Sequence, residues 1–316
     1  MTLISTIQAS PALFYLIVGF VSLMVGSFLN VVIHRLPIMM ERAWREGLAE
    51  LDAVDGELDT VANADNGAET STDNDAETSI ETGTQANTRT DVFNLAVPRS
   101  CCPNCGHQIT ALENIPVLSY LVLGGKCSSC RTPISVRYPI VEFVTMLLSL
   151  IVAWQLGPTP QAVLGIIVTW FLVAMSMIDF DHQLLPDNLT LPLMWIGLLA
   201  ALVPVLADLR SAVIGAAAGY LILWSIFQLF RLVTGKEGMG YGDFKLLAAL
   251  GALLGWQALP MVILLSSLVG AVVGIAIIMV TGRDRNIPIP FGPYLAAAGW
   301  IAMLWGDGIM RWYQGF

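Results

Sequence analysis

The sequence predicts an all-α polytopic membrane protein with about eight transmembrane helices. Of its 316 residues, 56% are hydrophobic and only 12% are charged, and the mean hydropathy is +0.71. A chain of this composition cannot build a water-facing surface on all sides, so a soluble globule is excluded. We expect membrane lipid to surround most of the chain, and we expect no nucleic-acid partner.

The number of helices follows from the stretches that lack Asp, Glu, Lys and Arg. A transmembrane helix needs about 20 mostly apolar residues. Two of the six long uncharged stretches can each form a helical hairpin, because Gly157–Pro160 and Gly255–Pro260 would break a helix near their middles. The piece from 246 to 255 is the shortest, and it either crosses fully, tilts or re-enters. The six stretches are 1–34, 143–178, 188–207, 211–230, 246–282 and 286–306.

Lys and Arg residues predict the orientation. If the N-terminus lies outside, 13 of the 15 basic residues fall in inner loops, and only Arg210 and Arg311 fall outside. The inner loops then include Lys236, Arg283 and Arg285. The first apolar segment has no basic residues before it and is long, so we expect a retained helix rather than a cleaved secretory signal.

An acidic insert separates the first helix from the remaining spans. About 46 to 91 holds 13 of the 24 acidic residues and one basic residue, Arg89, with few large apolar side chains. Such a segment cannot bury enough apolar surface to fold, so we expect disorder and a spacer role. The predicted organisation is a first transmembrane helix at 1–34, a cytoplasmic domain at 35–138, and a membrane core at 139–316.

Two pairs of cysteines follow the insert. Cys102 and Cys105 form one Cys-x-x-Cys pair, and Cys127 and Cys130 form a second after 21 intervening residues. This spacing favours a tetrahedral structural zinc site within 101–131, because the cytosol is reducing and no thioredoxin-like context accompanies the pairs. Cys101 is a fifth thiol that we expect to be inert. The cytoplasmic domain is therefore predicted to be a small zinc-binding loop domain.

Two aspartates, Asp179 and Asp243, are the candidate catalytic residues. They bracket two predicted spans, so both return to the same membrane face, which the orientation makes cytoplasmic. Two neighbouring carboxyl groups cannot both ionise readily, and such a pair supplies one base and one acid for peptide hydrolysis. A plainer interpretation is that Asp179 ends one helix and Asp243 caps another. Asp187 fits that capping role well.

Other catalytic arrangements have little support. The chain has only three histidines, His34, His107 and His182, which leaves few candidates for a Ser-His or Cys-His catalytic pair. No His-Glu-x-x-His motif of a metalloprotease is present. Glycines at 238, 240 and 242 give the backbone before Asp243 room to approach another segment closely.

Taken together, these residues resemble the type IV prepilin peptidase family, the bifunctional leader peptidases and N-methyltransferases of bacterial inner membranes. The resemblance covers nearly all of the chain except the acidic insert. Besides both cysteine pairs and the Asp179 segment, it rests on the motifs Gly26–Pro37, Asn114–Pro116, Arg137–Pro139 with Glu142, and Gly240–Asp243.

The resemblance implies that Asp179 and Asp243 cleave the basic leader of type IV prepilins or pseudopilins, the substrates of type IV pilus and type II secretion systems, at the cytoplasmic membrane face. It also implies methylation of the new N-terminal residue from S-adenosylmethionine. The cytoplasmic loop, with Gly26–Pro37 and Glu142 near it, is the implied location of that activity. No glycine-rich βαβ motif for the cofactor is visible in the sequence.

Two other functions stay open at the sequence level. A transporter could use the aspartates as a proton relay, although the spans hold few polar groups at mid-depth. A membrane anchor could recruit partners through its cysteine module, with the aspartates only capping helices. The sequence does not fix the particular pilin substrate or the oligomeric state.

Overall fold

The computed structural model describes residues 10–65, 93–110, 112–235, 239–281 and 290–314. The chain forms two compact units. One comprises residues 1–34 and 100–316, and the other comprises residues 35–99. Within the described ranges the secondary structure is helical, with only two isolated β-bridges and no strand, which confirms the all-α fold class.

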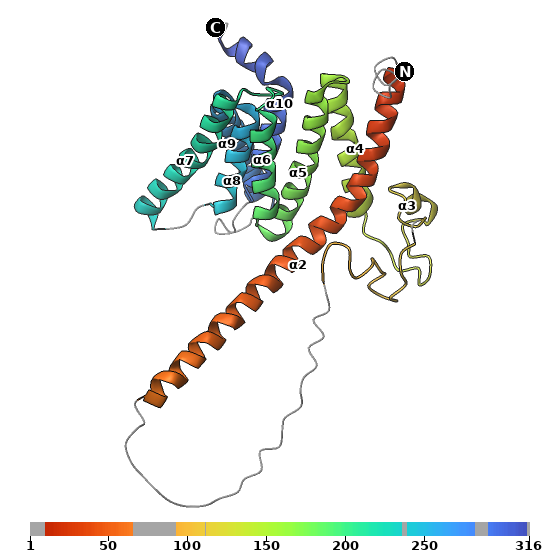
Figure 1. Ribbon diagram of the computed structural model, residues 1–316. Coiled ribbons are helices and arrows are strands. Elements are labelled where there is room, and N and C mark those ends of the chain that lie inside the picture. Colours follow the sequence, from red (N-terminus) through yellow and green to blue (C-terminus); the bar gives the residue numbers. More distant parts are fainter. Residues whose placement is uncertain (1–9, 66–92, 111, 236–238, 282–289, 315–316) are drawn as a thin grey trace, which may run out of the picture. The chain divides into compact units, whose positions relative to one another are not determined.

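Eight of the described helices have 14 or more residues, which agrees with the predicted number (Figure 1). A short helix, α3, and a single 3₁₀ turn, η1, add to them. The long helices are α2 (Pro11–Asp65), α4 (Arg137–Leu156), α5 (Pro160–His182), α6 (Asp187–Ala200), α7 (Leu209–Thr234), α8 (Tyr241–Leu254), α9 (Leu259–Thr281) and α10 (Gly292–Gln314); α3 is Leu118–Val122 and η1 is Trp256–Ala258.

The two predicted helix breaks occur where expected. α4 ends at Leu156, and Thr159 caps α5 by accepting a hydrogen bond from the Ala162 backbone N–H at 3.2 Å. α8 ends at Leu254, and its C-cap residue Gly255 has a φ of 81°, a value that favours glycine. Each uncharged hairpin is therefore two separate helices.

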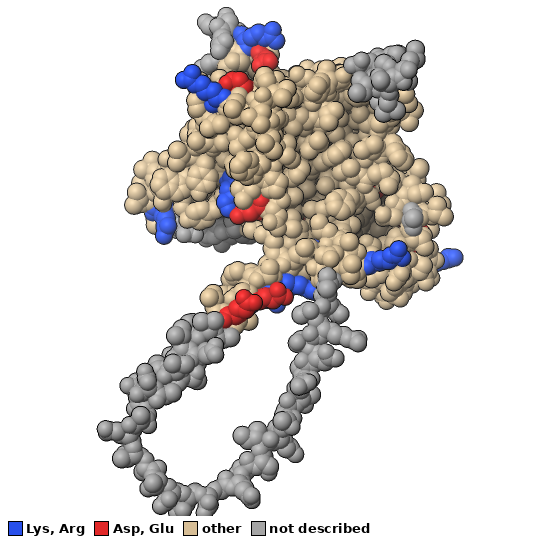
Figure 2. Space-filling view, in the orientation of Figure 1, with Lys and Arg blue, Asp and Glu red and all other residues tan. Residues whose placement is uncertain are grey.

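Five of the helices are long and apolar enough to cross a membrane, so the protein is a multi-pass membrane protein. These segments are Pro11–Leu51, Arg137–Leu156, Pro160–His182, Leu209–Thr234 and Trp256–Ile277. On the face drawn in Figure 2, uncharged side chains cover most of the surface. α6 and α8 have 14 residues each, or about 21 Å of helix, and α10 is not among the five segments, so complete crossing by these three helices stays a prediction.

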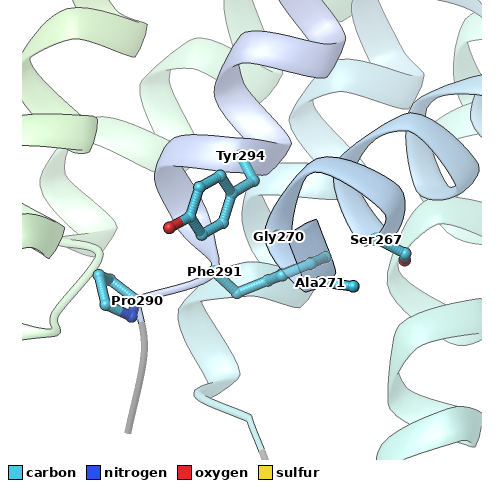
Figure 3. Close-up of a pocket in the computed structure, with 6 residues that line it drawn as sticks. All are labelled: Ser267, Gly270, Ala271, Pro290, Phe291 and Tyr294. Carbon is cyan, nitrogen blue, oxygen red and sulfur yellow. The ribbon is translucent and has the colours of Figure 1, made fainter. Parts of the chain in front are cut away.

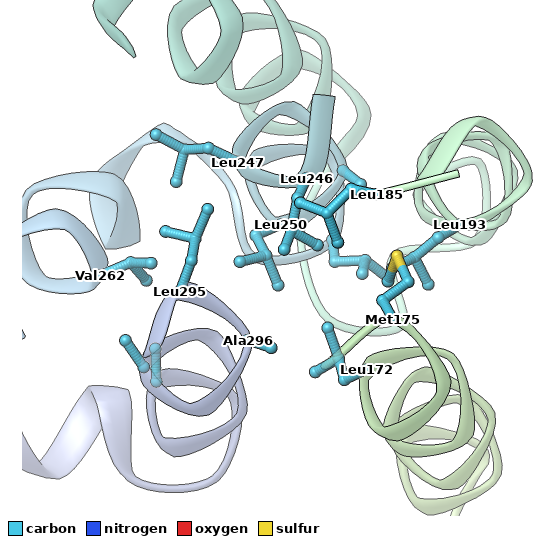
Figure 4. Packing of buried hydrophobic residues seen from close by; sticks show 14 of the residues in the cluster. Leu172, Met175, Leu185, Leu193, Leu246, Leu247, Leu250, Val262, Leu295 and Ala296 are labelled. Carbon is cyan, nitrogen blue, oxygen red and sulfur yellow. The ribbon is translucent and has the colours of Figure 1, made fainter. Parts of the chain in front are cut away.

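One apolar cluster joins α5 to α10. Met175 of α5, Leu193 of α6, Leu250 of α8 and Leu295 of α10 belong to this cluster and are each 1% exposed or less (Figure 4). Lipid tails are as apolar as leucine, so close packing and polar contacts between helices must supply much of the stability. One such contact is the 3.0 Å hydrogen bond from the Trp300 indole N–H of α10 to the Thr169 hydroxyl of α5.

Glycines bring α7 and α8 into direct backbone contact. A Cβ atom added at Gly215 of α7 would lie 2.2 Å from the Gly251 carbonyl oxygen of α8. One added at Gly219 would lie 2.6 Å from the Leu247 carbonyl oxygen. Gly215 and Gly219 form a Gly-x-x-x-Gly pattern, which is typical of close helix crossings in membranes. This crossing fixes the depth and rotation of α8, which carries Asp243.

The unit of residues 35–99 is held together around Arg35. Its side chain is 8% exposed, and its guanidinium donates to the carbonyl oxygens of Asn94 at 3.0 Å and Pro98 at 2.6 Å. Arg42 stacks on the Phe93 ring, with its guanidinium carbon 4.3 Å from the ring centroid. These contacts fasten the chain on the C-terminal side of the insert to the helix on its N-terminal side.

The acidic insert differs in part from the expectation. α2 continues to Asp65, so the helix extends into the range from about 46 that the sequence predicts to be disordered. Ala, Leu and Glu in this stretch are strong helix formers, and a helix needs no buried core of its own to form locally. Residues 66–92 lie outside the described residues, as do Lys236, Arg283 and Arg285 of the orientation argument. The predicted division into domains stays a prediction.

Candidate active site and metal centre

Asp179 lies in the last turn of α5 and is 5% exposed. The helix ends at His182, and its C-cap residue Gln183 takes a left-handed conformation and donates its backbone N–H to the Asp179 carbonyl oxygen. The side-chain atom Oδ2 accepts a buried hydrogen bond from the backbone N–H of Gly292, at 3.0 Å. Gly292 is the first residue of α10, so the carboxylate lies at the positive end of that helix.

Asp243 lies in the first turn of α8 and is 6% exposed. The N-cap residue of α8 is Gly240, so Asp243 is not the helix cap that the plainer interpretation assumed. Within the described part of the chain, no group is within hydrogen-bond distance of the buried Asp243 Oδ1 atom. A buried carboxyl oxygen without a partner is costly, and such groups in native proteins usually have a functional reason.

The fold brings the two aspartates together. The Asp179 carboxylate is close enough for its charge to act on Asp243. Leu185 is 7% exposed and lies close to both Gly242, beside Asp243, and Gly292, beside Asp179. A Cβ added at Gly242 would lie 2.6 Å from the Leu185 Cβ, and one added at Gly292 would lie 3.1 Å from the Leu185 Cδ1. The close approach that the sequence predicted for the glycines before Asp243 is thus present at Gly242, while Gly238 lies outside the described residues.

Ion pairs flank each aspartate. Arg137, the first residue of α4, pairs with Asp181, two residues after Asp179. Lys245, two residues after Asp243, contacts both carboxylate oxygens of Asp187 at 2.6 and 2.7 Å. The expectation that Asp187 caps α6 is wrong, because Pro186 holds the N-cap position and Asp187 pairs with Lys245 instead. These pairs tie α4 to α5 and α6 to α8 around the candidate site.

A pocket of about 290 Å³ lies between α9 and the start of α10 (Figure 3). Ser267, Gly270 and Ala271 of α9 line one side. Pro290, Phe291 and Tyr294 line the other, directly around the Gly292 position that contacts Asp179. Gly292, Asp179 and Asp243 are not among the residues that line this pocket.

The four cysteines of the predicted zinc site converge. All four sulfur atoms lie within 4.8 Å of one another, with 3.7 Å between those of Cys102 and Cys130 and 4.0 Å between those of Cys105 and Cys127. A tetrahedral Zn²⁺ with bonds of about 2.3 Å would place its sulfur ligands about 3.8 Å apart. The donor set and its geometry therefore fit a zinc ion. Cys101 is exposed and is not part of this cluster.

His107, Glu113 and Ser128, which were not predicted from the sequence to have a role here, form contacts beside the four cysteines. His107 Nε2 lies 3.3 Å from the Glu113 carboxylate and 3.3 Å from the Ser128 hydroxyl, which links the two cysteine loops. Hydrogen bonds from Ser128 and from Thr110 lower the pKa of Glu113 to about 2, so it is a carboxylate at neutral pH. The same histidine nitrogen contacts both Ser128 and Glu113, so the three residues do not form a proton relay of the catalytic-triad type.

Comparison with known proteins identifies the family. A model described as "Bacterial Peptidase A24 N-terminal domain" matches residues 20–156, and one described as "Type IV leader peptidase family" matches residues 166–275. The chain belongs to the type IV leader peptidase family. This confirms the resemblance stated from the motifs. No solved structure matches the chain.

Several relatives in this family match over nearly their whole length, and each is named "Prepilin leader peptidase/N-methyltransferase". The protein of Aeromonas hydrophila is 54% identical over 303 residues, which cover 96% of this chain and 94% of the relative. That of Pseudomonas aeruginosa is 51% identical over 316 residues, covering 100% and 99%. That of Legionella pneumophila is 43% identical over 306 residues, covering 97% and 96%.

The N-terminal motif of the family packs tightly in this structure. A Cβ added at Gly26 of α2 would lie 2.8 Å from the Glu142 Cα of α4. The Glu142 carboxylate is 8% exposed and accepts the Val117 backbone N–H at 2.8 Å. Val117 has a φ of 58°, a strained value for a β-branched residue. These residues join α2, α4 and the loop before α3 in a close contact.

Two residues that were not predicted from the sequence, Gly292 and Leu185, complete the surroundings of the aspartates. A signal for the first was available in Pro290–Pro293, where a glycine stands between two prolines just before an apolar helix. The Gly-x-x-x-Gly pattern of α7 was also not predicted, although small residues four positions apart are a signal of close helix crossings.

Proposed function

We propose that this protein removes the leader peptides of type IV prepilins or pseudopilins and methylates the new N-terminus, and that Asp179 and Asp243 perform the cleavage. The observation that carries the catalytic assignment is the convergence of two buried carboxyl groups, from helices α5 and α8, at one site. Family membership and the names of the relatives support the two activities.

The two carboxyl groups divide the chemistry of peptide hydrolysis. One ionised carboxylate takes a proton from a water molecule as the water oxygen attacks the scissile carbonyl carbon. The other, protonated, gives its proton to the carbonyl oxygen, which stabilises the developing charge. Both residues are about 95% buried, so few water molecules surround the reacting groups and their electrostatic effect on the reaction is strong.

The metal centre has a structural role in this proposal. Cys102, Cys105, Cys127 and Cys130 would hold a Zn²⁺ ion with four thiolates, which leaves no coordination position for a substrate or a water molecule. The bound ion would cross-link two loops that have little apolar core of their own. S-adenosylmethionine is the proposed methyl donor on the strength of the relatives' names, and no residue is assigned to it.

The site is proposed to face the cytoplasm from a bacterial inner membrane. The distribution of Lys and Arg favours this orientation, because 13 of 15 fall on the side of Asp179 and Asp243. A substrate leader with basic residues would reach this face without crossing the bilayer. Its apolar segment would remain in the surrounding lipid.

The test is leader removal by variants that are co-expressed with a prepilin. Asp179→Asn and Asp243→Asn, each made alone, are expected to insert and fold normally but to lose cleavage of a co-expressed prepilin by at least about 1,000-fold. Asp307→Asn, the same chemical change at an exposed position of α10, is the control and should cleave as the parent protein does. Mass analysis of the pilin reports leader loss and added methyl together. Normal processing by either of the first two variants would eliminate the proposed mechanism.

A further inference from the structure

We propose that Gly292 is a positioning residue whose backbone N–H assigns the two catalytic roles, with Asp179 as the base that takes the proton from water and Asp243 as the acid. This inference rests on the proposed peptidase function and adds the division of labour within the pair. It also adds the first turn of α10 to the active site.

Asp179 accepts a hydrogen bond from the backbone of a distant segment of the chain. The Gly292 N–H donates to Asp179 Oδ2 at 3.0 Å in a buried environment, across 113 positions of sequence. A carboxylate that accepts a backbone N–H at a helix N-terminus is favoured in its ionised form. With Oδ2 held by this bond, Oδ1 of Asp179 is the oxygen that can receive a proton from water.

Asp243 has different surroundings. Its Oδ1 atom is buried, and within the described residues it has no hydrogen-bond partner. A buried carboxyl oxygen without a donor makes the ionised form of its group costly, and the neutral form carries a proton that the group can donate. The neighbouring charge of Asp179 acts in the same direction, since two like charges in one site disfavour double ionisation.

The reaction then balances in two steps. In the first, the water oxygen bonds to the carbonyl carbon, a water proton goes to Asp179, and the Asp243 proton goes to the carbonyl oxygen. In the second, the carbon–nitrogen bond breaks, Asp179 gives its proton to the leaving amine, and Asp243 regains one from a hydroxyl of the intermediate. Both carboxyl groups end in their starting states.

Only glycine fits at position 292. A Cβ atom there would lie 2.7 Å from Asp179 Oδ2 and 3.2 Å from its carboxyl carbon. It would also lie 3.1 Å from the Leu185 Cδ1. Any side chain at this position therefore pushes the Asp179 carboxyl out of place and lengthens the hydrogen bond. The expected consequence is a defect in chemistry rather than in substrate binding.

The experiment compares Gly292→Ala with Gly308→Ala in the full-length protein. Position 308 lies on the same helix, and a Cβ there would meet nothing within 4 Å. For Gly292→Ala we expect kcat of leader removal to fall about 100-fold, as a displacement of about 1 Å in a catalytic group does. KM for the prepilin, methylation of a pilin that already lacks its leader, and the thermal midpoint should match those of Gly308→Ala.

A kcat for Gly292→Ala within about threefold of the parent value would overturn the inference. So would a parallel loss of cleavage, methylation and thermal midpoint, because that pattern indicates a structural role. A second variant replaces Gly292 by glycolic acid through cell-free translation, which removes the N–H without adding a Cβ. It should lower kcat at least about 10-fold, and an unchanged kcat would also refute the inference.

Failure of the underlying function gives a different result. If the parent protein does not cleave prepilin, or if Asp179→Asn cleaves it normally, the proposed peptidase mechanism fails. If the parent cleaves, Asp179→Asn does not, and both Gly292 variants cleave normally, only the role of Gly292 fails.

Discussion

The contact between α7 and α8 makes Gly215→Ala the most informative packing variant. A Cβ at position 215 would lie 2.2 Å from the Gly251 carbonyl oxygen and 2.9 Å from the Trp256 backbone nitrogen. Both neighbours are backbone atoms, so no side-chain rotation relieves the overlap. Ordinary van der Waals contact starts at 3.4 Å, so the two helices must separate by about 1 Å.

This separation has two expected consequences. α8 carries Asp243 two turns before Gly251, so moving α8 displaces that carboxyl from Asp179 and should lower kcat of leader removal about 100-fold. Overpacking of this size costs about 1 to 3 kcal/mol of stability, and the better helix propensity of alanine offsets up to about 1 kcal/mol of it. The variant should therefore still fold, with a somewhat lower thermal midpoint.

The assay is cleavage of purified prepilin by Gly215→Ala in detergent or lipid nanodiscs, with thermal unfolding followed in the same preparations. Gly308→Ala is the matched control, because it makes the same substitution where the added methyl group meets nothing. If Gly215→Ala cleaves within about threefold of the control and unfolds at the same temperature, the helices tolerate the methyl group and the reasoning fails.

Two further predictions concern the cysteine centre and an ion pair. Metal analysis is expected to find one equivalent of zinc in the parent protein and in Cys101→Ser, but none in Cys127→Ser. A parent protein with only trace zinc would contradict the four-thiolate site. The Lys245 and Asp187 side chains are 29% and 51% exposed, so water screens their ion pair. A double-mutant cycle with Lys245→Ala and Asp187→Ala should therefore give a coupling energy of only about 0 to 1 kcal/mol, and this energy should be smaller at high salt. A coupling well above that range would show that the pair is more than a surface contact.

Local features were predictable from the sequence because they depend on residues close together in it. Uncharged stretches gave the eight long helices, and Gly157–Pro160 and Gly255–Pro260 gave the breaks within two of them. The spacing of the cysteines gave a cluster whose sulfur atoms do converge. The motifs around Asp179 and Asp243 gave the family, which the comparisons confirm.

Other features were not predictable in this way. Asp187 has the composition of a helix cap, but its actual partner is Lys245, 58 positions later. Extension of α2 to Asp65 shows that a run of good helix formers can be helical even where its composition cannot support a folded core.

By itself, the sequence determined that this is a multi-pass helical membrane protein of the type IV leader peptidase family, with two candidate catalytic aspartates and four candidate zinc ligands. Only the tertiary structure decided which groups surround each aspartate. In the folded chain the Gly292 N–H donates a hydrogen bond to Asp179, and Leu185 lies close to both Gly242 and Gly292. The glycines of α7 pack against the backbone of α8. The physical reason is that hydropathy and helix breaks act within a few turns, whereas these contacts depend on how separate helices pack in three dimensions.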